Sequence, residues 1–193
     1  MSTPTRQRIV EAGADLLRAK GYSATGVKEI VAAAQAPFGS LYHHFPGGKE
    51  QLGEEAIRWS GAEYAKLVPL VFDGAPDMVT GVRMFFDGAA DNLVESGWTA
   101  GCPIATVALE VANSSEPLRV ATAEVFTSWL DGLAPRFAAA GLSDERAREL
   151  AITTIAALEG AFVLAQAWRD AAPLRMAGAV VARALEEALA EGE

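Results

Sequence analysis

The sequence predicts an all-helical protein, and three observations carry that prediction. No stretch alternates between apolar and polar residues strictly enough to form a half-buried strand. Alanine, the strongest helix former, is abundant throughout the chain. Prolines recur where apolar segments begin, and a proline in the first helical turn loses nothing by lacking an N–H group. We therefore expect nine helices, three short ones followed by six mostly longer ones.

The chain is large enough for a sizeable core. Its 193 residues are 51% hydrophobic and 21% charged, which excludes a disordered chain. The apolar runs are short and broken by charge, whereas a membrane span needs about 20 apolar residues. The polar N-terminus lacks the apolar core of a signal peptide, so we expect a cytoplasmic protein with no membrane partner. Cys102 is the only cysteine, which leaves no disulfide framework and no cysteine-based zinc site.

Capping and breaking residues place the four N-terminal helices. Thr3 is expected to cap the first helix and Gly21 to stop it. Thr25 is expected to cap the second, and Pro46 begins the break that ends the third. The expected ranges are 4–20, 26–34, 37–45 and 49–68.

Prolines open most of the five later helices. Ser143 is expected to cap the helix before the last, and Pro135 marks a point where a helix could kink or break. No flexible linker separates the helices, so two parts that move together are expected, one at residues 1–50 and the other at residues 51–193. The expected ranges of the later helices are 76–97, 103–113, 117–140, 143–170 and 173–191.

Charge is distributed unevenly along the chain. The formal net charge is −9, but residues 1–50 contain six basic and four acidic side chains. This segment is therefore mildly basic, and the remainder is strongly acidic. A basic N-terminal segment followed by an acidic remainder is expected when that segment binds a polyanion such as DNA.

Residues 25–52 have the pattern of a helix-turn-helix. Two short helices are joined by a turn of about three residues, and the second has apolar anchors, Leu41 and Phe45, behind its polar groups. A helix that enters a major groove needs small or hydrogen-bonding side chains in front of such anchors. Lys49, in the first turn of the next helix, combines a cation with free N–H groups, which suits a phosphate. Double-stranded DNA is the expected partner.

A longer pattern runs through the same stretch. Its residues are Thr25, Lys28, Ile30, Ala33, Gly39, Ser40, Leu41, Tyr42, His43, His44, Phe45, Lys49, Glu50 and Leu52. The pattern resembles the DNA-binding domain of the tetracycline-repressor (TetR) family. With residues 101–104, Gly-Cys-Pro-Ile, the chain is also similar to the subgroup of lincomycin-resistance-type multidrug regulators. The resemblance implies a dimeric repressor with DNA contacts from Thr25, Lys28, Phe38, Gly39, Ser40, Tyr42, His43 and Lys49.

The chain departs from the TetR pattern at three positions. Gln35 stands in the turn where the family often has glycine, and Pro37 stands where a serine often precedes the recognition helix. The recognition helix is therefore expected to lack a side-chain cap, which is worth about 1 kcal/mol. Phe38 replaces a residue that is often polar or basic. We expect it to contact a thymine methyl group rather than only to pack, because it leads the recognition helix.

The C-terminal part is expected to bind a small apolar effector, because its many aromatic side chains suit a ligand cavity. Glu110 or Glu159 would favour a hydrophobic cation if either faced inward, and the sequence leaves open whether they lie in a pocket or on the surface. The candidate ligand residues are Phe85, Trp129, Phe162 and Gln166, with Trp98, Cys102 and Thr106 nearer the mouth.

The last two helices have the pattern of a homodimer interface. Each is apolar over much of its circumference, which favours a second buried face besides the one on its own subunit. Binding to two operator half-sites also requires a symmetric dimer. The candidate interface residues are Ile152, Ile155, Ala156, Gly160 and Val163 in one helix and Leu174, Ala177, Val181 and Leu185 in the other.

Two other functions compete with a ligand-responsive repressor. An architectural DNA-binding protein without an effector would have less reason for an acidic, aromatic-rich C-terminal part. Cys102 at a helix start could be a redox sensor or a nucleophile, but a nucleophile needs a base, and both histidines lie in the DNA-reading unit. As neighbours on a helix, His43 and His44 do not form a metal pair. No enzyme activity, metal or cofactor is therefore expected.

Overall fold

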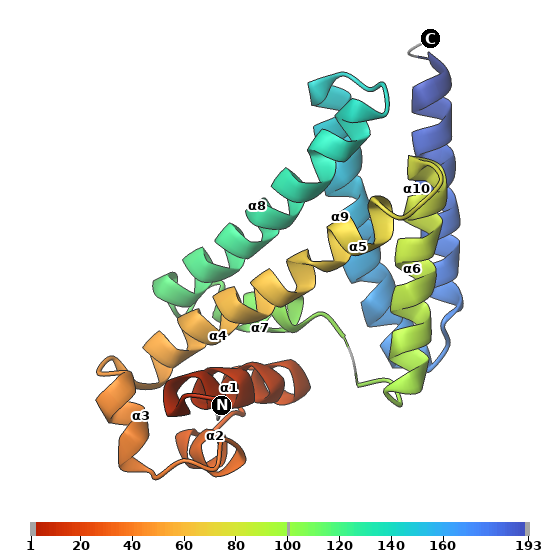
Figure 1. Cartoon of the computed structure of the whole chain (residues 1–193). Helices are drawn as coiled ribbons and strands as arrows, with labels where there is room; N and C mark the ends of the chain where they lie inside the picture. The colour runs from red at the N-terminus through yellow and green to blue at the C-terminus, as the bar shows by residue number, and fades with distance from the viewer. Residues whose placement is uncertain (1–2, 100, 192–193) are drawn as a thin grey trace. The chain divides into compact units, whose positions relative to one another are not determined.

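The computed structural model describes residues 3–99 and 101–191, and all regular secondary structure in these ranges is helical (Figure 1). The helices are α1 Thr5–Lys20, α2 Val27–Ala33, α3 Gly39–His44, α4 Gly48–Ala65, α5 Leu67–Phe72, α6 Met78–Glu95, α7 Pro103–Val111, α8 Glu116–Ala139, α9 Asp144–Trp168 and α10 Ala172–Glu191.

The predicted all-helical architecture is confirmed, and one predicted helix is interrupted. α4 and α5 are separated by Lys66 alone and together replace the helix expected at 49–68. Pro69, in the first turn of α5, has no N–H group to donate to the carbonyl four residues earlier, at Ala65. The missing hydrogen bond accounts for an interruption at this point.

Two helix starts show which capping signals were correct. The hydroxyl of Ser143 accepts a hydrogen bond from the N–H of Arg146 at 3.3 Å, so the predicted cap of α9 is confirmed. α6 begins after Asp77, whose carboxylate accepts from the N–H of Thr80 at 2.8 Å. An aspartate cap and not the preceding proline therefore sets this start, and the sequence prediction missed it.

Two other predicted caps are wrong. The N-cap residues of α1 and α2 are Pro4 and Gly26, and neither helix has a side-chain cap. Thr3 offers only its carbonyl oxygen, which accepts from Arg8. Thr25 turns its hydroxyl back to the end of α1. Pro135 lies inside α8 without ending it.

The chain contacts divide the protein into two compact units. The first contains the described residues of Met1–Glu63 and Cys102–Phe126, and the second contains those of Tyr64–Gly101 and Thr127–Glu193. In the first unit α7 packs on α1, as α2 and α3 do. The helix-turn-helix therefore shares its compact unit with a helix that follows it far along the sequence.

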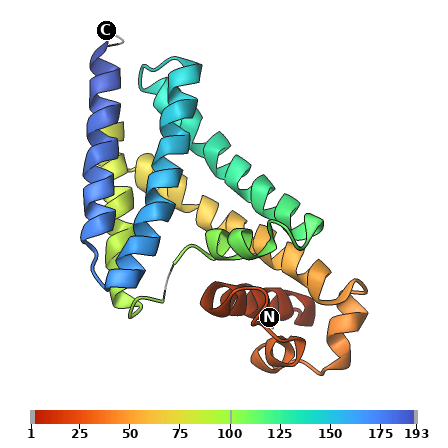
Figure 2. The same cartoon turned by 180° about the vertical axis from the view of Figure 1, so that it is seen from behind.

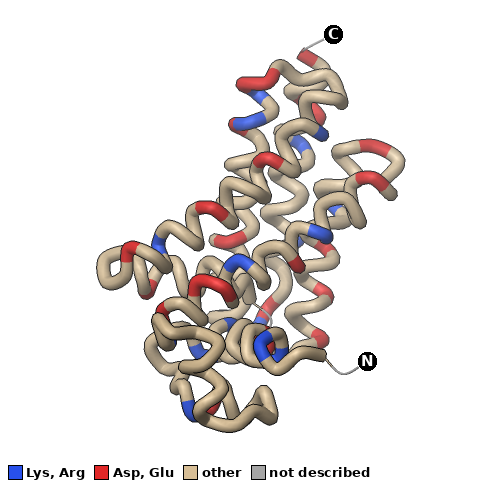
Figure 3. The backbone as a smooth tube through the Cα atoms, turned by 60° about the vertical axis from the view of Figure 1, so that its left-hand side comes forward, with Lys and Arg blue, Asp and Glu red and all other residues tan. Residues whose placement is uncertain are grey.

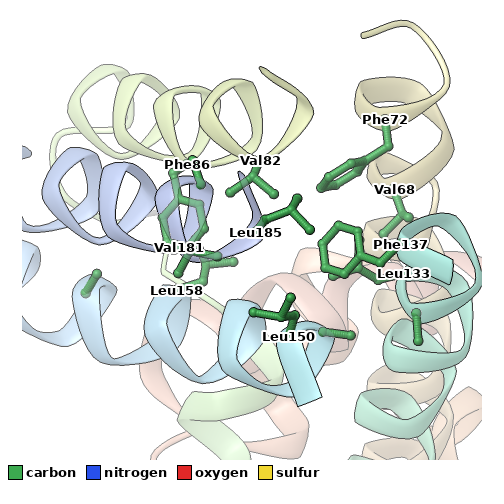
Figure 4. Packing of buried hydrophobic residues seen from close by; sticks show 14 of the residues in the cluster. Val68, Phe72, Val82, Phe86, Leu133, Phe137, Leu150, Leu158, Val181 and Leu185 are labelled. Carbon is green, nitrogen blue, oxygen red and sulfur yellow. The ribbon is translucent and has the colours of Figure 1, made fainter. Parts of the chain in front are cut away.

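Each unit has its own hydrophobic core. In the second unit α10 packs against α6 and α9, and Figures 1 and 2 show α6 and α10 side by side. Gly178 permits this approach, because a Cβ atom there would lie 2.6 Å from Cβ of Phe86. Figure 4 shows the side chains that meet in this core, among them Phe72, Phe86, Leu133, Phe137, Leu158, Val181 and Leu185. The first unit's core contains Ile9, Val10, Ile30, Val31, Ala34, Leu41, Phe45 and Leu52.

Four residues nominated for the dimer interface lie in the interior of the subunit. Ile155, Leu174, Val181 and Leu185 are all buried. They form the face with which α9 and α10 pack on their own subunit, so their assignment to a face free for a second chain is wrong. Helical periodicity identified apolar stripes correctly but did not show which stripe the core already covers.

Val181→Glu is therefore expected to unfold the second unit instead of producing a folded monomer. Val181 is 3% exposed, and a buried carboxylate without a partner costs about 3 kcal/mol or more. Val94→Glu is the matched control, because Val94 is 47% exposed on α6 of the same unit. Circular dichroism melting of both variants measures the difference. An unchanged melting temperature for Val181→Glu would contradict this packing.

Candidate nucleic-acid interface

The turn between α2 and α3 has the geometry of a helix-turn-helix. Gln35 has φ of 50°, in the left-handed region that favours glycine. The N–H of Gln35 donates to the carbonyl of Ala32, and the N–H of Ala36 donates to that of Val31. These bonds close the end of α2 and reverse the chain. The positive φ explains why a glycine would suit this position and why the glutamine adds strain.

The recognition helix α3 is short and lacks a side-chain cap. Its N-cap residue is Phe38, which makes no capping bond, as Pro37 at the expected serine position predicted. A helix of six residues is not stable by itself in water. Leu41 and Phe45 are both fully buried in the first unit's core. These two anchors hold α3 in place.

The opposite face of α3 carries the residues nominated for DNA contact. Phe38 and Tyr42 are 49% and 53% exposed, and their rings meet edge to face with centroids 6.1 Å apart. His43 is exposed and Ser40 is half-buried. A Cβ atom on Gly39 would meet no atom within 4 Å, so the backbone there is open to an approaching surface. Five of the eight nominated residues therefore gather on or beside one short helix.

Thr25 does not belong to this exposed face. Its side chain is 1% exposed, and its hydroxyl donates to the carbonyl of Gly21 at 2.6 Å. The side chain is thus used to fix the turn between α1 and α2, and its assignment to DNA contact is wrong. Lys28, by contrast, is exposed on α2.

Lys49 lies against the same turn. Its Nζ donates to the carbonyl of Tyr22 at 2.7 Å and lies 4.2 Å from the centroid of the Tyr22 ring. Burial of the ammonium lowers the pKa of Lys49, and the nearby carboxylate of Glu110 partly offsets that effect. The residue nominated for phosphate contact therefore also has a structural role inside the first unit.

The sequence alone could not determine the position or the role of Glu110. Its carboxylate, on α7, accepts the backbone N–H of Tyr22. The sequence left it open whether Glu110 lies in a ligand pocket or on the surface, and the structure engages it with the turn between α1 and α2. The two residues are separated by 88 positions along the chain, so no local pattern could have paired them.

The basic side chains of the first segment are largely paired within the unit. Arg6 pairs with Glu55 and Lys20 with Glu29. Arg8 donates to the carbonyl of Ala34 at 3.0 Å. Figure 3 shows acidic and basic positions interspersed along the helices. Part of the positive charge of this segment is therefore paired with carboxylates of the same unit.

The nominated ligand residues divide between the two units. In the second unit Phe85, Trp98 and Phe162 pack against the core. Trp129 is also buried there, and Gln166 donates from Nε2 to the carbonyl of Trp98 at 3.2 Å. Cys102 and Thr106 belong to the first unit.

Cys102 and Thr106 are both engaged at the start of α7. Sγ of Cys102 accepts from the N–H of Ala105 at 3.4 Å, and the hydroxyl of Thr106 donates to the carbonyl of Cys102 at 3.0 Å. A separate hollow of about 420 Å³ lies between α8 and α9, beside the ion pair of Arg148 and Asp131. Its lining does not include the nominated ligand residues.

α9 presents a second apolar stripe to solvent. Ile152, Ala156, Gly160 and Val163 are all exposed, and Ala177 on α10 is half-buried. These residues of α9 recur at spacings of three and four and so share one face. The interface prediction did not include four further large apolar side chains that are exposed on α9 and α10, namely Leu164, Trp168, Met176 and Val180.

By length and composition α9 could cross a membrane, and among the described residues it is the one helix that could. The sequence predicted only apolar runs too short to span a membrane, and α9 is longer and more apolar than that expectation. A core helix meets the same two criteria, and Leu150, Thr154 and Leu158 of α9 are buried within the second unit. The apolar character of α9 is therefore accounted for in part by its own core.

The chain matches two family models and resembles full-length relatives. Residues 9–56 match the model of bacterial regulatory proteins of the tetR family, and residues 78–180 match the C-terminal domain of LmrA/YxaF-like transcriptional regulators. The uncharacterized HTH-type transcriptional regulator Rv0196 of Mycobacterium tuberculosis is 36% identical over 174 residues, 88% of each chain. The uncharacterized HTH-type transcriptional regulator YxaF of Bacillus subtilis is 34% identical over 170 residues, which are 88% of this chain and 89% of YxaF.

A solved structure agrees with these sequence matches. The regulatory protein TetR from Rhodobacter sphaeroides superposes with a TM-score of 0.82 at 29% identity, over 94% of this chain and 98% of the other. The fold and the helix-turn-helix thus define a DNA-binding transcriptional regulator of the TetR family, and the chain belongs to that family. Within it, the C-terminal domain is of the LmrA/YxaF-like kind. Regulators of this family bind DNA and act as dimers.

Phe45→Ala is expected to destabilise the first unit by about 3–5 kcal/mol, because it removes a fully buried aromatic anchor of α3. Phe38→Ala removes the same side chain from the exposed face and should change stability by about 0.5 kcal/mol or less. Urea denaturation followed by circular dichroism compares the two variants. Equal destabilisation would show that α3 is not anchored through Phe45.

Proposed function

We propose that the chain is a cytoplasmic, dimeric transcriptional repressor that binds a palindromic operator and is released by a small apolar effector. The observation that carries the proposal is that α3 has one buried side and one exposed side. Leu41 and Phe45 fix one side in the core, while Phe38, Tyr42 and His43 point to solvent on the other. A rigid short helix with this exposed set has the dimensions and chemistry to enter a major groove.

Each exposed group has a distinct proposed role. His43 offers ring nitrogens to a base edge, and Phe38 offers an apolar ring edge to a thymine methyl group. Tyr42 donates its hydroxyl to a phosphate, with Ser40 and Lys28 as further polar contacts. Phosphate contacts fix the register, and the contacts of His43 and Phe38 distinguish sequences. Lys49 would reach a phosphate only by leaving the carbonyl of Tyr22.

The dimer is proposed to form through the exposed stripe of α9 with Met176 and Val180 of α10. Large exposed apolar side chains at helical spacing mark an interaction surface. Gly160 supports this assignment, because a Cβ there would meet no atom of its own subunit and its absence permits close approach of a partner helix. A symmetric dimer has two recognition helices, one for each half-site of a palindromic operator.

The effector is proposed to bind in the second unit, among the aromatic side chains of α6 and α9. Phe85 and Phe162 are half-buried at the edge of its core and could line a cavity when a ligand enters. The engagement of Glu110 with the first unit removes one reason to favour a cation, so a neutral apolar compound is proposed. Such a compound releases the operator only if it binds the two states of the repressor with different affinity.

Selection from a random duplex library is expected to yield a pseudo-palindromic sequence for the wild-type chain. His43→Ala should then relax the preference at one base position in each half-site, with a loss of about 1–3 kcal/mol in discrimination. Tyr42→Phe should weaken binding to all duplexes alike, because it removes only a phosphate contact. Fluorescence anisotropy on matched duplexes measures both. Unchanged base preference in His43→Ala would remove His43 from the base contacts.

Val163→Glu is expected to give a folded monomer that binds its operator weakly. Val163 is 61% exposed, so the subunit tolerates the charge, whereas burial at a dimer interface would cost several kcal/mol. Val94→Glu is the control, since Val94 is similarly exposed on α6. Analytical ultracentrifugation gives the mass of each variant. A dimeric Val163→Glu with wild-type operator affinity would place the dimer interface elsewhere.

A further inference from the structure

Both backbone polar groups of Tyr22 are hydrogen-bonded to side chains from other helices. On one side Glu110 of α7 accepts its N–H, and on the other Lys49 of α4 donates to its carbonyl at 2.7 Å. The N–H of Thr25 donates to the same carbonyl at 3.2 Å. The backbone of one residue in the turn after α1 therefore connects three elements of the first unit, α1, α4 and α7.

Gly21 makes the approach of Glu110 possible. Its φ of 76° lies in the region that favours glycine, and a Cβ there would lie 2.6 Å from Oε2 of Glu110. The carbonyl of Gly21 accepts the buried hydroxyl of Thr25. The glycine thus leaves space for the carboxylate of Glu110 to reach the N–H of the next residue, Tyr22.

A second contact ties the region after α7 to the start of α4. The hydroxyl of Ser115 donates to Oε1 of Glu50 at 2.7 Å. Leu118 of α8 lies close to Gly53 of α4, because a Cβ on that glycine would come within 2.9 Å of it. These contacts hold α4, and α4 also packs against the turn, because the same Cβ on Gly53 would lie 3.0 Å from the ring of Tyr22. The backbone N–H of Tyr22, however, is bound by Glu110. Glu110 contacts the turn that leads into α2, and α3 is the next helix after α2 in the chain.

We propose that Glu110 is a positioning residue for operator binding: by accepting the N–H of Tyr22, it fixes the turn from which α2 and the recognition helix are oriented. α7 follows directly after Gly101, the last residue of the second unit before the chain returns to the first. The carboxylate of Glu110 joins this helix to the turn that leads into the helix-turn-helix. The proposal deepens the proposed DNA-binding function and depends on it.

The carboxylate of Glu110 accepts a hydrogen bond and also carries a negative charge. Substitution can separate these two properties. Glutamine keeps an oxygen that accepts the Tyr22 N–H but removes the negative charge near Lys49. Alanine removes both. If positioning is what matters, the glutamine variant binds DNA as well as the wild type or better, because a negative charge near the DNA-facing unit has also been removed. The alanine variant loses the positioned turn.

The experiment measures the affinity of full-length wild type, Glu110→Gln and Glu110→Ala for the selected duplex, at a temperature where all three are folded. We expect Glu110→Ala to bind about fivefold more weakly, which corresponds to one hydrogen bond, and Glu110→Gln to bind within about twofold of the wild type or more tightly. Hydrogen exchange of the Tyr22 amide, measured without DNA, should become faster in the alanine variant only.

The controls distinguish positioning from general stability. Glu116→Ala removes an exposed carboxylate that pairs with Arg119 on α8 and should leave both readouts unchanged. A merely structural role would lower the melting temperature of Glu110→Ala without changing its affinity, and that result would overturn the proposal. Equal losses in the alanine and glutamine variants would also overturn it. Failure of the wild type to bind any selected duplex would instead overturn the proposed function.

Discussion

A six-residue helix cannot hold its own shape in water, and the first unit is built around that constraint. The cost of starting a helix is recovered only over many residues, and α3 has too few. It also lacks a capping side chain, and the turn before it contains a glutamine in a left-handed conformation. The stability of α3 must therefore come from outside it, through the burial of Leu41 and Phe45.

The same constraint explains why the first unit extends beyond the helix-turn-helix. The supports of α3 are α1, α2 and α4, and they need a fixed turn between α1 and α2. α7 supplies that fixation through Glu110, although it is remote in the sequence. A residue such as Thr25, which resembles a DNA contact in the sequence pattern, is used to build the same turn. The exposed face of α3 can then remain free for DNA because the interior supports it fully.

Sequence reasoning predicted several features that depend on local patterns, although the caps expected at Thr3 and Thr25 were wrong. Helix order, the cap at Ser143 and the uncapped start of α3 follow from residues next to one another in the chain. The anchors Leu41 and Phe45 were also predicted, because a buried side of a short helix leaves a clear apolar signature.

What could not be predicted depends on contacts between distant segments. Periodicity gave α10 an apolar stripe but could not show that Val181 faces the core while Val180, one residue earlier, faces solvent beside a further exposed apolar set. Gln35 could be seen to replace a glycine, but not to adopt its conformation. The pairing of Glu110 with Tyr22 has no local signature at all, because it is created by the packing of α7 on α1.

The most direct test of this account is protection of guanine N7 from methylation on the selected duplex. The account predicts that the wild-type chain protects two groups of major-groove positions, related by two-fold symmetry and separated by about one helical turn or a multiple of it. Phe38→Ala and His43→Ala should each lose protection within both groups. Protection of a single group, or a pattern that neither substitution changes, would contradict the assignment of α3 as the helix that enters the major groove.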